Sequence, residues 1–205
     1  MEETKEIDIK GNWEKFVVEL LATKRDGVEK LIEFLETKTD IKEAPASTKF
    51  HLNVKGGLVE HSLNVLRFIR EAQAIIEAPD ISEENLTLSA LLHDLCKVNY
   101  YVEGEAWDKE WKDKTNEWRK MKIWLVDDKL PLGHGEKSLI LAVRYVPLKN
   151  SELAAIRWHL GGFEPGINFG YPTGYPFRSA SDQYPLVKLL IIADMMAEAF
   201  ESFTY

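Results

Sequence analysis

A histidine and an aspartate, His93-Asp94, end the apolar run Leu88-Ser89-Ala90-Leu91-Leu92. This run is typical of a buried helix, and a carboxylate buried without a partner is strongly destabilising. Adjacent residues on a helix point about 100° apart, so the two side chains cannot lie on the same narrow face of the helix. They can, however, both contact one ligand that lies at the helix end. A metal ion is the usual object that draws a histidine and an aspartate together out of an apolar run.

A second buried acid is expected in the last helix, where Asp194 interrupts the apolar segment "KLLIIADMMAEAF". Any single histidine on an apolar helix is usually a residue of the core or its rim, but this chain combines two buried acids with several histidines in helical context. One shared explanation is a metal site assembled from several helices. The five histidines are His51, His61, His93, His134 and His159.

The spacing of apolar residues predicts a mainly helical chain. We expect helices at 12–37 with a break or bend at Gly27, at 57–78, from a Ser82 cap to about Cys96, at 135–147, at 151–160 and over the last twenty residues. Residues 98–131 have a highly charged centre and flanks rich in β-formers, which predicts a β-hairpin with a mobile tip. A Gly/Pro/aromatic loop is expected from residue 161 to the last helix.

Length and composition favour one domain and exclude several classes of protein. The 205 residues are 45% hydrophobic and include no apolar run of the roughly 18 residues that a membrane span needs. The charged N-terminus is not a signal peptide and the chain has one cysteine, Cys96, so a cytoplasmic location is expected. The net charge of −8 makes long nucleic acid an unexpected partner, although a local basic pocket is compatible with it.

The order His61, His93-Asp94, Asp194 resembles that of the HD-domain superfamily of metal-dependent phosphohydrolases. The resemblance covers roughly residues 50 to 200, and it is closest to short HD-domain hydrolase-like proteins of bacterial and prophage genomes. Those proteins carry segments similar to "GHGEKS" and "AIRWHLGGF" of this chain. The resemblance implies an all-α HD-domain helical bundle with a small β-hairpin insert around residues 98–131. The whole chain, 1–205, is then a single HD-type domain, with 1–46 as an N-terminal helical extension and 47–205 as the metal-site core.

The resemblance also implies a set of ligands. His61, His93, Asp94 and Asp194 are expected to hold one metal ion, and Asp94 to bridge to a second ion. His134 and His159 match the two extra histidines of binuclear members of the family. Histidine and carboxylate ligands suit one or two divalent ions of Mn, Fe, Co, Ni or Zn. Such an ion lowers the pKa of water enough to supply hydroxide near neutral pH.

Three cationic residues are expected to bind substrate. Lys97 follows Asp94 by three residues, and a lysine at this place in the family often contacts the phosphate or the leaving group; a surface lysine is the plainer interpretation. Lys137 in "GHGEKS" and Arg178 near the aromatic loop are further candidates, and Arg157 ranks below Lys97 and Lys137. His51 stays outside the ligand set, because its position in the sequence gives no geometry.

The sequence therefore predicts a phosphohydrolase that acts on a small nucleotide or other phosphate ester through a metal-activated hydroxide, with Asp94 and Lys97 as catalytic residues. Two alternatives stay open. One is a di-iron oxygenase on the same fold, which ligand types alone do not distinguish. The other is a non-catalytic nucleotide-binding module, which is weakened because all six expected ligands are present. No membrane partner is expected, and the oligomeric state is left open.

Overall fold

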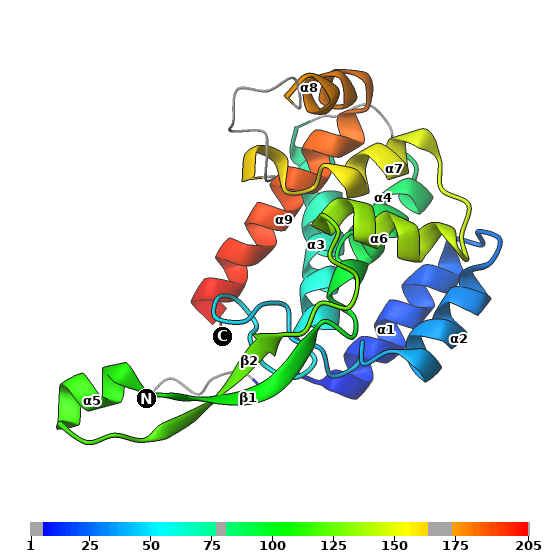
Figure 1. Cartoon of the computed structure of the whole chain (residues 1–205). Coiled ribbons are helices and arrows are strands. Elements are labelled where there is room, and N and C mark those ends of the chain that lie inside the picture. Colours follow the sequence, from blue (N-terminus) through cyan, green and yellow to red (C-terminus); the bar gives the residue numbers. More distant parts are fainter. Residues whose placement is uncertain (1–5, 77–80, 164–173, 205) are drawn as a thin grey trace.

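A computed structural model of the chain describes residues 6–76, 81–163 and 174–204. Helices form the body of the molecule and a two-stranded ribbon projects from one side of it (Figure 1). The predicted all-α fold with a β-hairpin is thereby confirmed. The described elements, in chain order, are α1 (Ile9–Ala22), α2 (Val28–Lys38), α3 (Gly57–Ile75), α4 (Glu83–Leu92), η1 (Leu95–Lys97), β1 (Tyr101–Trp107), α5 (Lys109–Thr115), β2 (Lys120–Val126), α6 (His134–Val143), α7 (Asn150–Arg157), η2 (Gly161–Phe163), α8 (Gly174–Gln183) and α9 (Pro185–Thr204).

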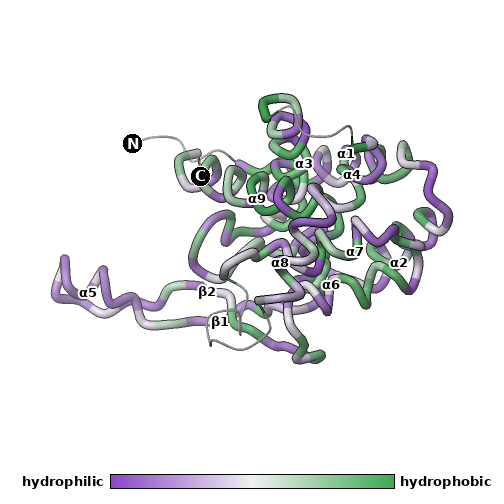
Figure 2. The backbone as a smooth tube through the Cα atoms, turned by 90° about the horizontal axis from the view of Figure 1, so that it is seen from above, coloured by the Kyte–Doolittle hydropathy of each residue, from purple (hydrophilic) through white to green (hydrophobic). Residues whose placement is uncertain are grey.

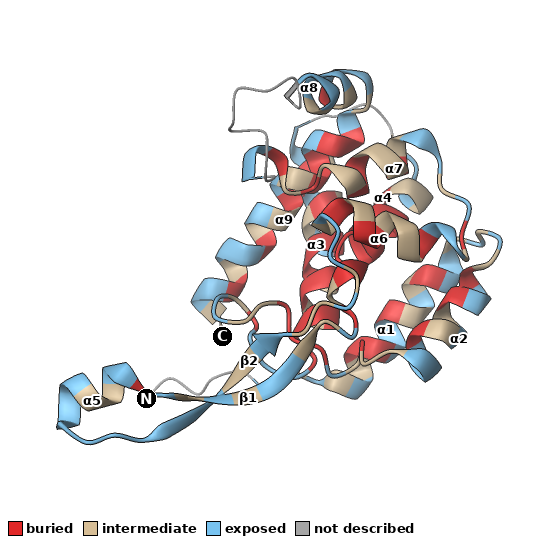
Figure 3. Ribbon diagram, in the orientation of Figure 1, coloured by how far each residue is buried: buried red, intermediate tan, exposed pale blue. Residues whose placement is uncertain are grey.

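The long helices α3 and α9 pack against each other at the centre of the body, with α4 and α7 beside them. Their inward faces are buried, and the hydrophobic stretches of the tube gather there (Figures 2 and 3). Burying a leucine or isoleucine contributes about 1.5–3 kcal/mol, so these faces fix how the helices that carry His61 and Asp194 lie together. Fully or almost fully buried members of the two faces are Leu58, Val65, Leu66, Ile69, Leu186, Val187, Leu190 and Ala193.

The predicted break at Gly27 is confirmed, since it separates α1 from α2. Gly27 has φ of 83°, in the left-handed region that glycine adopts without strain. A Cβ at this position would lie 1.9 Å from the carbonyl oxygen of Tyr145, in the segment between α6 and α7. The turn between the first two helices therefore packs backbone to backbone against the rest of the domain.

The helix that leads to His93 ends earlier than the sequence predicts. Ser82 caps it as expected, by accepting a hydrogen bond from Asn85 N, but α4 stops at Leu92. Asp94 leaves helical geometry with φ of −108° and ψ of 20°, and the 3₁₀ turn η1 follows. Because the chain turns between His93 and Asp94, their side chains converge: His93 Nε2 lies 3.5 Å from Asp94 Oδ2.

The hairpin pairs β1 with β2 in antiparallel register, from Tyr101 opposite Val126 to Trp107 opposite Lys120. The tip, which the sequence predicted to be mobile, contains the short helix α5. Asp108 explains this helix: its carboxylate accepts from Trp111 N at 2.8 Å and pairs with Arg119. At the base of the ribbon, Trp124 Nε1 donates to the carbonyl oxygen of Asn53, which ties the ribbon to the body.

The segment between η2 and α9 also differs from the expected loop. Residues 164–173, which hold most of the aromatic loop, lie outside the described residues, and α8 follows at Gly174–Gln183. Pro176 is in the first turn of α8, where the amide hydrogen that proline lacks has no partner within the helix. Among the described helices none combines the length and the apolar character of a membrane span.

Candidate metal centre

A cavity of about 250 Å³ lies where the central helices meet the segment before α3. Histidines and carboxylates from distant parts of the chain face it, so the fold gathers most of the residues that the sequence singled out. The lining residues are Ala46, Ser47, Thr48, Phe50, His51, His61, Asp94, Lys97, Tyr101, His134, His159, Leu160, Asp194 and Glu198.

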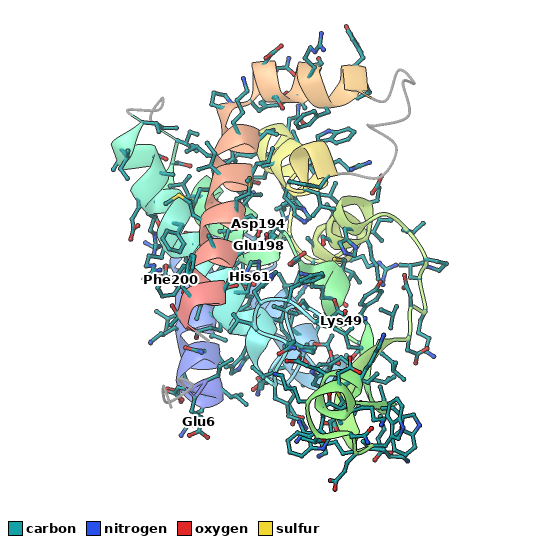
Figure 4. The ribbon with its side chains drawn as sticks, turned by 90° about the vertical axis from the view of Figure 1, so that its left-hand side faces the viewer. Glu6, Lys49, His61, Asp194, Glu198 and Phe200 are labelled. Atoms are coloured by element: carbon teal, nitrogen blue, oxygen red, sulfur yellow. The ribbon has the colours of Figure 1, made fainter. Side chains whose placement is uncertain are left out.

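Asp94 and Asp194 stand at the centre of a group of histidines. His61 Nε2 lies 3.1 Å from Asp194 Oδ1 and 3.8 Å from Asp94 Oδ2. His93 Nε2 lies 3.5 Å from Asp94 Oδ2 and 3.8 Å from Asp194 Oδ1. Figure 4 shows His61 beside Asp194 of α9. His61, His93, Asp94 and Asp194, which come from α3, the α4–η1 junction and α9, are thus brought together.

His159 reaches the same carboxylate from the other side. Its Nε2 atom lies 3.5 Å from Asp94 Oδ1, whereas His61 and His93 lie near Oδ2. The two oxygens of Asp94 therefore face different histidines, which divides the cavity into two neighbouring positions.

His93 and His159 are both held in one orientation by the backbone. Nδ1 of His93 lies 2.7 Å from the Ala90 carbonyl, and Nδ1 of His159 lies 2.8 Å from the Ile156 carbonyl. A carbonyl only accepts, so each Nδ1 donates its proton and a neutral ring is left with a lone pair on Nε2. Both Nε2 atoms are buried and have no hydrogen-bond partner within the described residues.

These unpartnered atoms require a cation or a proton between them and the carboxylates. Burial lowers the pKa of His93 to about 4, so its ring is neutral at pH 7. At His159 burial alone lowers the pKa, but the carboxylate of Asp94, 3.5 Å from Nε2, outweighs burial and raises the pKa. The unpartnered Nε2 atom of His159 can therefore be satisfied in two ways, by a proton shared with Asp94 or by a metal ion between the two side chains.

Glu201 contacts the site and was not predicted from the sequence. It is buried, and its Oε2 lies 3.0 Å from Nδ1 of His61, while its Oε1 accepts from Asn64 at 2.9 Å. Carboxylates commonly hold the second nitrogen of a metal-binding histidine in this way. The spacing in the sequence could have predicted it, because Glu201 follows Asp194 by seven residues. Seven residues are about two helical turns, so both acids lie on the same face of the helix.

The charge on His61 follows from these two acids. Burial alone lowers its pKa, but Glu201 and Asp194 outweigh burial and raise the pKa to about 10. The pKa of Asp194 lies far below its usual range despite burial, because His61 donates to it and the neighbouring histidines add positive potential. The site therefore holds ionised carboxylates, the form that binds a metal ion.

Lys97 is positioned on Asp94. Its Nζ atom lies 2.5 Å from Asp94 Oδ2, and the side chain is almost buried in the cavity wall. Although burial disfavours the charged carboxylate, Lys97 and the histidines lower the pKa of Asp94 well below its usual value. A surface position for Lys97 is thereby excluded.

His134 begins α6 and lines the cavity, with Tyr100 next to it at 6.3 Å between ring centroids. The helix start is pressed against the end of α7: a Cβ on Gly135 would lie 2.2 Å from the carbonyl oxygen of Arg157. This close approach brings His134 and His159, which belong to different helical segments, to one cavity.

Two expected substrate-binding residues lie away from the cavity lining. Lys137 is buried and donates to Asp128 at 2.6 Å. Arg178 is exposed on α8 and borders a separate hollow with Tyr175 and Asp182. Arg157, ranked lower from the sequence, pairs with Glu136.

His51 enters the cavity from the segment before α3. Its ring lies 4.9 Å from that of His61, and its Nδ1 lies 3.6 Å from Glu198 Oε1. Burial and the neighbouring His61 lower its pKa to about 4. The segment is irregular, so sequence spacing held no signal for this placement.

The residues present fit a divalent metal ion. Imidazole nitrogens and carboxylate oxygens are the donor set of transition metals in proteins. Within the described residues, His61, His93 and Asp194 offer ligand atoms that all lie within 4.8 Å of one another. His51, His61 and Glu201 do the same, but Glu201 already holds Nδ1 of His61. The first group is therefore the better position for an ion.

This fold and site define an HD domain. The family model for the HD domain matches residues 58–197, more than half of the chain, and the chain belongs to this family. HD domains bind divalent metal ions, in agreement with the donor set of the cavity.

The chain is also similar to a curated protein, the dihydroneopterin 2′,3′-cyclic phosphate phosphodiesterase of Methanocaldococcus jannaschii. The two are 30% identical over 90 residues, which cover 37% of this chain and 36% of the relative. The match thus spans little more than a third of the relative's own length. No solved structure matches the chain at comparable significance.

Proposed function

We propose that this protein is a metal-dependent phosphohydrolase that cleaves a phosphate ester of a small, nucleotide-like molecule. The observation that carries the proposal is the pair of buried Nε2 atoms, on His93 and His159, that face opposite oxygens of Asp94 without a hydrogen-bond partner among the described residues. Such acceptors facing an ionised carboxylate are satisfied by a cation.

The proposed first ion is held by His61, His93, Asp94 and Asp194. A second ion is proposed between Asp94 and the pair His134 and His159, because Asp94 Oδ1 faces His159 and His134 lines the same cavity. When bound, such ions activate water and neutralise phosphate charge.

The protein's own groups have separate tasks in this proposal. Lys97 holds Asp94 in place and adds a positive charge to the cavity wall, where a phosphate oxygen can meet it. Glu201 fixes the ring of His61 from the side away from the cavity. The attraction between His61 and Asp94 is screened little by water, because both side chains are buried.

The proposed substrate is small. A cavity of about 250 Å³ is below the usual range of about 300–1,000 Å³ for small-molecule pockets, which favours a small substrate. The name of the archaeal relative specifies a cyclic phosphate on a small heterocyclic compound, which supports this class of substrate. The excess of 34 acidic over 26 basic residues is unfavourable for a long nucleic acid.

The test is a metal and substrate survey with the full chain. Protein stripped with a chelator is loaded with Mn²⁺, Co²⁺, Ni²⁺ or Mg²⁺ and assayed on nucleoside 2′,3′-cyclic phosphates and nucleoside monophosphates. We expect metal-dependent release of product that is lost in His93→Ala and kept in the control Asp182→Ala, whose carboxylate is exposed on α8. Oxygen uptake by an iron-loaded sample without ester cleavage would instead identify an oxygenase, and equal cleavage by His93→Ala would reject the proposed site.

A further inference from the structure

The turn at residues 47–52 forms one wall of the cavity, and its own hydrogen bonds hold it in shape. The Ser47 hydroxyl accepts from Phe50 N at 2.9 Å and donates to the His51 carbonyl at 2.8 Å. Ala46 N donates to the Leu52 carbonyl at 3.0 Å, and closes the turn. Leu52 has φ of 46°, a conformation that a branched residue keeps only where its surroundings impose it. The turn is therefore built to present its side chains in fixed directions.

Two consecutive residues of this turn face the cavity at different depths. Phe50 lines the cavity, yet it is 81% exposed, so its ring does not serve the core. His51 has a side chain only 8% exposed, and its buried Nε2 atom has no hydrogen-bond partner within the described residues. An exposed aromatic ring thus stands at the rim, next to an unpartnered polar atom inside.

We propose that this turn recognises the substrate. Phe50 stacks on a heteroaromatic ring of the ester, and His51 Nε2 forms a hydrogen bond with the sugar or linker next to the phosphate. This inference rests on the proposed phosphohydrolase activity and names the class of its substrate as a phosphate ester that carries a heteroaromatic ring. In this proposal the phosphate group lies inside the cavity beside Lys97, and the ring lies at the rim, where Phe50 is exposed.

A second place for the ring has to be distinguished from this one. A groove of about 600 Å³ runs under the ribbon, shares Thr48 with the cavity, and is lined by Trp107 and Trp124. Trp124 is engaged by its hydrogen bond to Asn53, whereas Trp107 is 60% exposed. Phe50 is the better assignment because it lines the metal cavity itself.

The test compares two substrates that differ only in the ring. The Mn²⁺-loaded full chain is assayed on adenosine 2′,3′-cyclic phosphate and on methyl riboside 2′,3′-cyclic phosphate, which lacks the base. For Phe50→Ala we expect the ratio of the two kcat/KM values to fall about tenfold, as the loss of one aromatic stacking partner predicts. Phe50→Trp should restore the ratio, and Tyr175→Ala, an equally exposed aromatic of α8, is the matched control.

The outcomes separate this inference from the proposed function. If wild-type protein cleaves both esters and the ratio of the two kcat/KM values is unchanged in Phe50→Ala, Phe50 does not bind the ring. If the ratio falls in Trp107→Ala instead, the groove under the ribbon holds the ring and the assignment to Phe50 is overturned. If the wild type cleaves neither of these esters nor any ester of the wider survey, it is the proposed function that fails.

The role of His51 is tested by measuring two quantities in a variant, the KM for each ester and the amount of bound metal. His51→Ala is expected to raise KM about tenfold for both esters, since it removes a hydrogen bond to a part that the two share, with the metal content unchanged. His51→Gln, which keeps a polar group, should recover part of the loss. A fall in bound metal in His51→Ala would show that His51 is a ligand of the ion and overturn its assignment to the substrate.

Discussion

Glu201 Oε2 lies 3.0 Å from Nδ1 of His61, and on the opposite side of the same ring Asp194 Oδ1 lies 3.1 Å from Nε2. Both acids belong to α9 and are two turns apart. One helix therefore holds the imidazole of its neighbour α3 from both ends, and the packing of α3 on α9 sets the direction in which His61 faces the cavity.

Replacing Glu201 tests whether this contact supports metal binding. Glu201→Gln keeps an acceptor for His61 and Asn64 but removes the charge that makes the ring a stronger ligand. Loss of such a partner lowers metal affinity by about 10- to 100-fold. Calorimetric titration of chelator-stripped protein with Mn²⁺ measures it, with Glu71→Gln on the exposed side of α3 as control. Equal affinities in wild type and Glu201→Gln would contradict this role.

The raised pKa of His61 predicts a pH dependence of the metal-free protein. A histidine with a pKa raised to about 10 in the folded state, against 6.5 unfolded, stabilises the fold fully below pH 6.5. That contribution is lost as the pH rises from 6.5 through 10. Urea denaturation of chelator-treated protein should therefore show falling stability over this range, and a shallower fall in Glu201→Gln. The same slope in both proteins would show that Glu201 does not hold the proton on His61.

The approach of α6 to α7 is tested at Gly135. Gly135→Ala places a methyl group 2.2 Å from the Arg157 carbonyl, so the helices must move apart. We expect a loss of about 1–3 kcal/mol in the free energy of unfolding, the usual range for overpacking. Gly162→Ala is the matched control, because a Cβ there meets nothing within 4 Å. If the two variants unfold at the same urea concentration, the close approach is not a structural requirement.

Arg25 tests whether the N-terminal helices belong to the same unit as the metal site. Its guanidinium lies 2.8 Å from Glu152 Oε1, a carboxylate of α7 that is fully buried. Arg25→Ala leaves that charge unpaired, which costs about 3–5 kcal/mol. Lys10→Ala, which removes an exposed partner of Glu14, should cost less than about 0.5 kcal/mol.

We propose on this basis that residues 1–46 are an extension that folds together with the core 47–205. Chemical denaturation should then show one transition that moves as a whole in Arg25→Ala. Two separate transitions, with only one displaced, would mean that the extension and the core unfold independently.

The sequence predicted the centre of the site because buried charge is rare and has to be explained. Asp94 and Asp194 interrupt apolar helices, and the structure places both acids among histidines in one cavity. Gly27 marked the break between the first two helices, since the left-handed backbone at that position favours glycine. These signals are local and do not depend on knowing the fold.

The parts that the sequence did not predict depend on contacts between distant residues. Glu201 resembles any acid near the end of a helix until α9 is packed on α3. His51 lies in an irregular segment, so no periodicity places it in the cavity. Lys137 was a candidate for the substrate as a cationic residue of "GHGEKS", and its pairing with Asp128 becomes visible only in the fold. Helix α5, which Asp108 caps, lies inside the highly charged segment, where the sequence predicted no helix.

The most direct test of the account is the metal-induced change in melting temperature of the wild type and of Asp94→Ala. Asp94 faces both proposed metal positions, so its removal should abolish the shift with Mn²⁺ while far-ultraviolet circular dichroism keeps its helical signal. At a metal concentration of 100 times Kd the wild type should gain about 2.7 kcal/mol, and so should the control Asp182→Ala. Metal-free Asp94→Ala should be less stable than the wild type, because the nearly buried ammonium group of Lys97 loses its partner. Equal metal-induced shifts in wild type and Asp94→Ala would show that Asp94 is not a ligand and would contradict the proposed metal centre.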